Sequence, residues 1–311
     1  MKIISVFNHK GGVGKTTSVV NLAVALTHLS KKVLVIDIDP QANTTSGLGL
    51  DKYNIENSLY ELFYANEDFD DNEAISDDDV EDGNATENDN EISDNEEDNI
   101  SDLKLLESEN LELRKKAIDI NEYISSTESG VDIIPSEAAL SGLEVELVEL
   151  DPIERTGQLK ELISNINDES YDYILIDCPP SLGLLSINAL VASNSIIIPV
   201  QAEYYALEGI SELMNTFNLV KRQLNINLEI EGVLLTMFDK RTYLSYEVVE
   251  EVKSYFKTKV FKVMIPRNPR LAEAPSHGLS TIEYDPKSQG AYAYLILAEE
   301  IINNESENID E

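Results

Sequence analysis

The chain has one cysteine, Cys178, and no tryptophan among its 311 residues. A single cysteine excludes an internal disulfide framework and any metal site built from several cysteines. No apolar run approaches the roughly 18 residues of a membrane-spanning helix. The opening MKIISVFNHKGG turns polar too soon for a secretory signal. We therefore expect a soluble, cytoplasmic protein.

Basic residues are also scarce, with 23 Lys and Arg against 59 Asp and Glu and a formal net charge of −36. Residues 67–102 hold 18 of the acids and no base, so the other 275 residues carry −18. Such a balance argues against a general nucleic-acid coat or a polybasic membrane protein, although a local basic patch stays possible.

Residues 66–102 have the composition of a disordered insertion. They are almost entirely Asp, Glu, Asn and Ser, too polar to offset the entropy of ordering the chain. A solvated loop, an electrostatic decoy for a basic patch and a partner-binding segment all stay open as its role. Residues 103–117 are compatible with a short amphipathic helix, and residues 304–311 form an acidic tail.

Short apolar runs bounded by Gly, Pro, Asn or Asp recur along the rest of the chain and are typical of buried strands. They lie at residues 3–7, 33–36, 131–134, 173–176, 196–200, 232–237 and 260–265. Helical patterns lie between them at residues 16–29, 187–192, 207–224 and 246–256, and a further one follows at residues 290–302. This alternation predicts an α/β fold with a mostly parallel sheet and helices on both faces.

A phosphate-binding loop follows the first expected strand. Residues 10–17 read KGGVGKTT and fit the pattern G-x-x-x-x-G-K-[ST] only when its first position, here His9, is relaxed. Glycines let successive backbone N–H groups face phosphates, and the following helix adds its positive dipole end. Lys15 is then placed to reach the β and γ oxygens, and Thr16 offers a hydroxyl to Mg²⁺.

Aspartates follow two further strands, at the carboxyl ends where open α/β sheets bind ligands. Asp37 and Asp39 fall on the same side of their strand. Either one can orient an attacking water or support the water shell of a metal, while a helix cap or a loop turn is the alternative for each. Asp177 closes the run YILI and is the expected Mg²⁺ partner of a phosphate-loop protein.

Six segments, in order, resemble the ParA/Soj partition ATPases of chromosomes and plasmids. They are KGGVGKTT, VLVIDIDPQANTTSGLG, YDYILIDCPPSLGLLSINAL, IPVQAEYYALEGI, EGVLLTMFDKRT and IPRNPRLAEAPSHG. The resemblance covers residues 1–65 and 118–303. It implies a single P-loop NTPase domain of the deviant Walker A class, with ATP and Mg²⁺ as cofactors and slow ATP hydrolysis.

The resemblance also implies roles for individual residues. Lys10 matches the signature lysine that crosses an ATP-sandwich dimer to the partner's nucleotide, and Lys15 matches the loop lysine. Asp39 matches the aspartate linked to hydrolysis, and Asp177 the water-mediated Mg²⁺ position. The implied nucleotide contacts are Lys10, Gly11, Gly12, Val13, Gly14, Lys15, Thr16 and Thr17, with Pro266, Arg267 and Asn268 near the adenine.

Members of the family bind DNA nonspecifically through basic residues of the C-terminal half. Residues 221–287 hold 11 bases and 9 acids. Arg241, in DKRT, matches a DNA-contacting arginine of the family. Asn218 stands where relatives often carry arginine, so Lys221 or Arg222 is expected to compensate, although solvated helix faces explain the same bases. Phosphate contacts are independent of sequence and sensitive to salt, which suits a protein that tracks bulk DNA.

The function we expect is DNA partition by an ATP-dependent homodimer that is associated with the nucleoid and stimulated by a ParB-like partner, without a membrane. A nucleotide-gated regulator of transcription or replication is one alternative. A MinD-like membrane positioner is another, disfavoured because the acidic end lacks a basic amphipathic helix.

Overall fold

The computed structural model describes residues 1–66, 119–203 and 206–309. Nearly all of the expected disordered insertion and the possible helix at 103–117 lie outside these residues. The chain divides into two units, one made of residues 1–63 and 120–311 and the other of residues 64–119. The candidate site lies entirely in the first unit.

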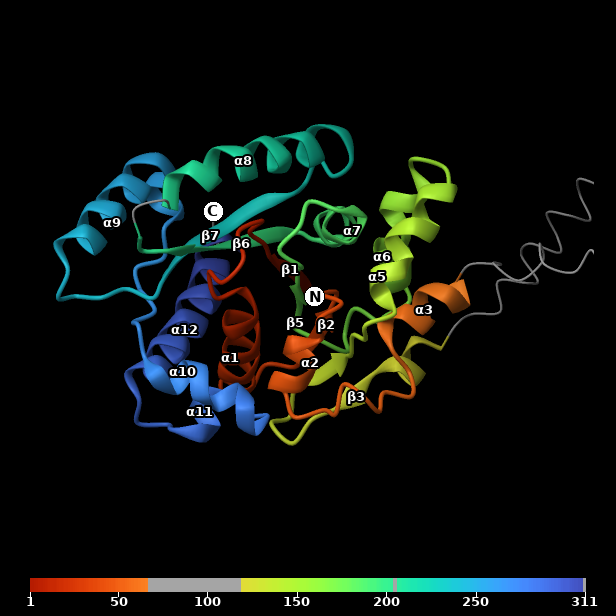
Figure 1. Cartoon of the computed structure of the whole chain (residues 1–311), viewed down its shortest axis with the longest axis horizontal. Coiled ribbons are helices and arrows are strands. Elements are labelled where there is room, and N and C mark those ends of the chain that lie inside the picture. The colour runs from red at the N-terminus through yellow and green to blue at the C-terminus, as the bar shows by residue number, and fades with distance from the viewer. Residues whose placement is uncertain (67–118, 204–205, 310–311) are drawn as a thin grey trace, which may run out of the picture. The chain divides into compact units, whose positions relative to one another are not determined.

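The first unit is built on a sheet that, within the described residues, has seven strands in the order β3-β4-β2-β5-β1-β6-β7 (Figure 1). Only β3 pairs with its neighbour in an antiparallel way, and all other neighbours are parallel. This confirms the expected mostly parallel sheet. The strands are β1 (Lys2–Val6), β2 (Val33–Asp37), β3 (Ser125–Ser126), β4 (Asp132–Ile134), β5 (Tyr173–Asp177), β6 (Ser195–Gln201) and β7 (Glu229–Thr236).

Helices cover both faces of this sheet because the chain crosses it in two directions. From β1 it passes across β5 to β2, and later from β5 across β1 to β6 and on to β7. Such crossovers are right-handed, so opposite directions place their helices on opposite faces. α1 (Lys15–His28) and α12 (Gln289–Ile309) pack together on one face, and α7 (Leu184–Ala192) and α8 (Ala206–Gln223) lie on the other (Figure 1).

The described residues form further helical elements. They are α2 (Asn43–Gly47), α3 (Leu59–Asn66), η2 (Ile120–Tyr123), α5 (Leu140–Glu146), η3 (Leu147–Glu149), α6 (Glu154–Ser164), α9 (Tyr243–Phe256), η4 (Lys257–Lys259), α10 (Pro269–Glu273), η5 (Ala274–His277) and α11 (Thr281–Tyr284). None of the described helices combines the length and apolar character needed to cross a bilayer.

Residues 260–265, expected as a buried strand, do not form one, and that prediction was wrong. Isolated bridges join this part of the chain to β7 and to the residues that follow β7. The N–H groups of Phe261 and Ile265 also donate to the carbonyls of Val233 and Leu235, at 3.1 and 2.8 Å. The N–H groups of Lys262 and Val263 donate instead to the carboxylate of Glu300 on α12, at 2.8 and 3.3 Å. This side chain interrupts the ladder that the apolar pattern favoured.

The C-terminal helix is longer than the expected 290–302, since α12 ends at Ile309 and takes in most of the acidic tail. Glu305 explains the extension: its Oε2 accepts from the hydroxyl of Tyr173 at 2.6 Å, and its Oε1 lies 2.8 Å from the ammonium of Lys2. The helix is therefore held to β5 and β1 by one of the acids of the expected acidic tail.

Candidate nucleotide site

The phosphate loop connects the carboxyl end of β1 to the first turn of α1. Gly12 and Gly14 have φ values of 75° and 92°, the left-handed region that residues with a side chain rarely adopt. Gly11 and Gly12 are exposed, and Val13 is buried beneath them. The N–H groups of the first turn of α1, which starts at Lys15, have no earlier turn to bond. The loop thus presents backbone donors at a helix N-terminus, the arrangement that binds phosphates.

Two side chains that the sequence analysis did not single out hold this loop in shape. The amide of Asn8 donates to the carbonyl of Pro199 at 2.8 Å, and its oxygen accepts from the N–H of Lys10 at 3.0 Å. Thr236, at the end of β7, donates its hydroxyl to the carbonyl of Val13 at 2.8 Å. Asn8 directly follows the apolar run 3–7, which was an available signal, whereas Thr236 lies inside the expected run 232–237 and nothing in the sequence marked it.

Lys15 is 7% exposed, and its ammonium donates to the carbonyl of Lys10 at 3.3 Å. Burial lowers the pKa of Lys15, while the charge of Asp177 acts in the opposite direction. A buried cation with one weak neutral partner favours an incoming anion. Lys10 itself is half-buried, and its ammonium group makes no ion pair with the described part of the chain.

Asp177, at the end of β5, faces the first turn of α1. Its Oδ2 accepts from the hydroxyls of Thr16 at 2.8 Å and Thr44 at 2.6 Å. Its Oδ1 is buried and has no hydrogen-bond partner among the residues that the structure describes. Burial raises the pKa of Asp177 to about 6, and the Thr44 and Thr16 hydroxyls oppose that shift. A hydroxyl beside a carboxylate with an open oxygen fits Mg²⁺, a cation that prefers oxygen ligands and keeps several waters.

Asp37 and Asp39 occupy different surroundings two residues apart. Asp37 is fully buried, and its Oδ2 accepts from both the N–H and the hydroxyl of Thr45 at 2.8 Å. Burial, followed by the charge of Asp177, raises the pKa of Asp37 to about 8. Asp39 is 7% exposed, and its Oδ1 accepts from the N–H of Gln41 at 3.0 Å. Asp37 therefore anchors α2, which leaves Asp39 as the carboxylate available for chemistry.

A cavity of about 360 Å³ opens beside the phosphate loop. Gly14 and Thr17 line one side of it, and residues 266–269 line another. Arg267 pairs with Glu203 at 2.9 Å, and Asn268 caps α10 by accepting from the N–H of Arg270. The structure thus brings Pro266, Arg267 and Asn268 next to the loop, where a base attached to bound phosphates has room.

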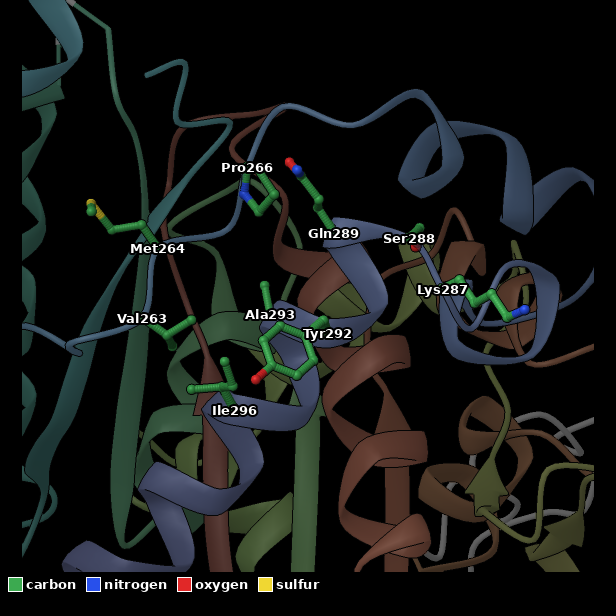
Figure 2. A pocket seen from close by; sticks show the side chains of 9 residues that line it. All are labelled: Val263, Met264, Pro266, Lys287, Ser288, Gln289, Tyr292, Ala293 and Ile296. Atoms are coloured by element: carbon green, nitrogen blue, oxygen red, sulfur yellow. The ribbon is translucent and has the colours of Figure 1, made fainter. Parts of the chain in front are cut away.

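A second cavity, of about 470 Å³, lies between α12 and residues 263–266 (Figure 2). Val263 lies opposite Ala293 and Ile296 of α12, and Lys287 stands at the edge of the cavity (Figure 2). It shares Pro266 with the first cavity but has none of the phosphate-loop residues or carboxylates in its lining. The candidate chemistry therefore belongs to the loop and its neighbours.

The expected DNA-binding residues do not gather at one place in the monomer. Arg241 follows β7 and is 81% exposed, with its guanidinium held by both carboxylate oxygens of Asp239 at 2.7 and 2.9 Å. These bonds hold the pKa of Asp239 well below its ordinary value. Lys221 on α8 pairs with Glu229, the first residue of β7, at 2.7 Å, and Arg222 is exposed beside it. β7 is roughly 25 Å long, so these bases lie near its opposite ends.

Comparisons with known proteins agree with this geometry. A family model described as an AAA domain matches residues 1–85 and 77–230. The sporulation initiation inhibitor protein Soj of Bacillus subtilis is 47% identical, over 97% of this chain and 99% of that protein. The chromosome partitioning protein ParA of Myxococcus xanthus is 41% identical, over 98% of this chain and 89% of that protein.

A solved structure shares the fold and was obtained with ligands. It is a cobyrinic acid a,c-diamide synthase from Mycobacterium smegmatis with a bound ATP analogue and magnesium. It superposes with a TM-score of 0.69 and 26% sequence identity, covering 96% of this chain and 93% of that one.

Proposed function

The chain belongs to the ParA/Soj family of chromosome-partitioning ATPases, and on that premise we propose that it segregates DNA as an ATP-gated homodimer. It is a P-loop ATPase that uses ATP and Mg²⁺. In the proposed cycle the ATP-bound dimer binds DNA nonspecifically on the nucleoid, and a ParB-like protein stimulates hydrolysis and so releases it. The cargo is a chromosome or a plasmid.

The observation that carries the proposal is the contact of the two loop lysines. Lys15 is buried with its ammonium on the carbonyl of Lys10, while the side chain of Lys10 is half-buried at the rim of the loop. Lys15 is placed to neutralise the phosphates of its own nucleotide. Lys10 is then available to a nucleotide on a second subunit, where its charge would act as an arginine finger does.

Hydrolysis requires an oriented water, and we assign that task to Asp39. Its carboxylate is nearly buried, and its backbone carbonyl accepts from the hydroxyl of Ser136 at 2.7 Å, which fixes the loop that carries it. Thr16 and Asp177 would hold Mg²⁺, Asp177 through water, and the metal supplies charge stabilisation to the phosphates. Loop amides and Lys15 hold the phosphates, so the chain's own part is positioning and charge compensation.

The cavity beside Gly14 and Thr17 supports a base-binding role for Pro266, Arg267 and Asn268. A purine attached to phosphates on the loop would lie against the ring of Pro266. The chemistry of the lining does not by itself select adenine, so the preference for ATP rests on membership of the family.

Exposed apolar side chains of residues 145–153 support dimerisation. Val145, Val148 and Ile153 are 72%, 58% and 80% exposed. Large apolar side chains that stay exposed in the monomer are candidates for burial in a protein interface. We assign them to the contact between subunits.

DNA binding is assigned to Arg241, Lys221 and Arg222. Because Arg241 and Lys221 lie near opposite ends of β7, the proposed surface is extended, as suits a protein that follows the phosphate backbone rather than a short sequence. In the free protein Arg241 pairs with Asp239, and Lys221 pairs with Glu229. A DNA phosphate would therefore have to replace one of these carboxylates.

Steady-state ATP turnover tests the proposal. The protein is assayed alone, with DNA, with a ParB-like protein from the same genome, and with both. We expect the largest stimulation with both present, and no turnover by Lys15→Ala under any condition. Turnover that neither DNA nor the ParB-like protein alters would contradict the partition cycle while leaving the ATPase intact.

A further inference from the structure

α2 brings a second hydroxyl to the carboxylate that faces the metal position. Thr44 is fully buried, and its Oγ1 donates to Asp177 Oδ2, the oxygen that also accepts from Thr16. Two hydroxyl donors thus occupy one oxygen of Asp177, while the other, Oδ1, is buried and has no hydrogen-bond partner in the described part of the chain. The Thr44 hydroxyl therefore helps to decide which oxygen of the carboxylate stays open.

The position of Thr44 is fixed by contacts that do not involve the phosphate loop. Its neighbour Thr45 donates twice to Asp37, and the Thr45 hydroxyl accepts from the N–H of Ser136 at 3.0 Å. Gly47, at the end of α2, packs so closely on α1 that a Cβ there would lie 3.1 Å from a methyl of Val20. α2 is therefore a fixed platform for the Thr44 hydroxyl.

We propose that Thr44 is a positioning residue for Mg²⁺, which keeps Asp177 Oδ1 directed at the water shell of the metal. Thr16 is the hydroxyl that would ligate the cation, and its proton is already accepted by Oδ2. The second bond, from Thr44, prevents the carboxylate from rotating and exchanging its two oxygens. This inference rests on the Mg²⁺–nucleotide site of the proposed function, and does not depend on dimerisation or DNA binding.

Thr44 acts on the metal and not on the phosphates, because its hydroxyl bonds Asp177 rather than Lys15 or the loop amides. Loss of an outer-shell partner typically weakens metal binding by about 10- to 100-fold. Removing the Thr44 hydroxyl should therefore leave nucleotide affinity without metal unchanged and raise the Mg²⁺ concentration needed to reach full affinity. Most changes in the phosphate loop would alter both quantities.

The test is a fluorescence titration of the full-length protein with a mant-labelled ADP, in EDTA and at increasing Mg²⁺. Thr44→Val keeps the volume of the side chain and removes the donor. We expect its affinity in EDTA to equal that of the wild type and its Mg²⁺ midpoint to rise by about 10- to 100-fold. Thr44→Ser, which keeps a hydroxyl, should restore the wild-type midpoint.

Ser46→Ala is the matched control on the same helix. Among the described residues, its hydroxyl donates to the carbonyl of Ala42, the residue before α2, at 3.0 Å and not to Asp177, so its loss should leave the Mg²⁺ midpoint unchanged. An unshifted midpoint in Thr44→Val, or an equal loss of affinity in EDTA and in Mg²⁺, would overturn the inference. A wild type whose nucleotide affinity does not respond to Mg²⁺ would overturn the metal site of the proposed function as well.

Discussion

Replacing Asp37 by asparagine should change how the stability of the nucleotide-free protein depends on pH. The carboxyl is fully buried at the end of β2, directly beside Asp177 in the register of the sheet. Burial and that neighbouring charge raise its pKa from 3.8 to about 8. Asp37→Asn keeps the shape of the side chain and an oxygen that can accept from Thr45, but it cannot ionise.

The sign and the size of the effect follow from proton linkage. Because the pKa is raised on folding, the native protein holds a proton between pH 4 and pH 8 that the unfolded chain has lost, and stability falls as pH rises through this window. One extra proton corresponds to about 1.4 kcal/mol per pH unit. At pH 8 the carboxyl of Asp37 is half deprotonated in the native state. Between pH 6 and pH 8 the free energy of unfolding of the wild type should therefore fall by about 2 kcal/mol because of Asp37.

Urea denaturation in EDTA, followed by circular dichroism at pH 6, 7 and 8, measures this difference. The free energy of unfolding of Asp37→Asn, minus that of the wild type, should rise by about 2 kcal/mol across the series. Asp172→Asn, at an exposed position before β5, is the control and should show a constant difference. Parallel profiles for the wild type and Asp37→Asn would mean that the donors around Asp37 keep it ionised throughout, which would refute the reasoning.

Other substitutions separate the steps of the cycle. Lys15→Ala should weaken nucleotide binding by roughly 100-fold, because it removes the buried cation at the phosphates; equilibrium titration with labelled ATP measures this. Asp39→Ala should bind ATP normally but lose turnover by about 100-fold and accumulate as an ATP-bound dimer in gel filtration; normal turnover would exclude Asp39 from the mechanism. Arg241→Glu should flatten the slope of log DNA affinity against log salt by roughly 0.9, while Asp239→Asn, which releases the guanidinium, should strengthen DNA binding and leave ATP affinity unchanged. If both variants show the same dependence of DNA affinity on salt as the wild type, the DNA-binding surface lies elsewhere.

The parts of the site that the sequence predicted are those that follow from local order along the chain. Lys15 and Thr16 come directly after a buried strand and open a helix, so chain geometry alone places them at the carboxyl edge of the sheet. Asp177 closes another apolar run and ends at the same edge, because parallel strands finish side by side. These placements need no knowledge of distant contacts.

What the sequence did not predict depends on partners far along the chain. The bond of Thr44 to Asp177 spans 133 positions, and that of Thr236 to Val13 spans 223. Residues 260–265 have the apolar pattern of a strand, but Glu300 on α12 takes the N–H group of Val263, which lies between the two N–H groups that donate to β7. An apolar pattern indicates which residues are buried. It does not indicate which distant side chain accepts hydrogen bonds from their backbone N–H groups.

The most direct test of the central claim, that nucleotide gates a DNA-binding dimer, is the affinity of the protein for a random-sequence DNA duplex in three states. Fluorescence anisotropy is measured without nucleotide, with ADP and with ATP, always in Mg²⁺ and at one fixed salt concentration. We predict tight DNA binding in the ATP state and in neither of the other two states. Lys10→Ala should lose this DNA binding even though it still binds ATP. Equal DNA affinity in all three states, or an unaffected Lys10→Ala, would contradict it.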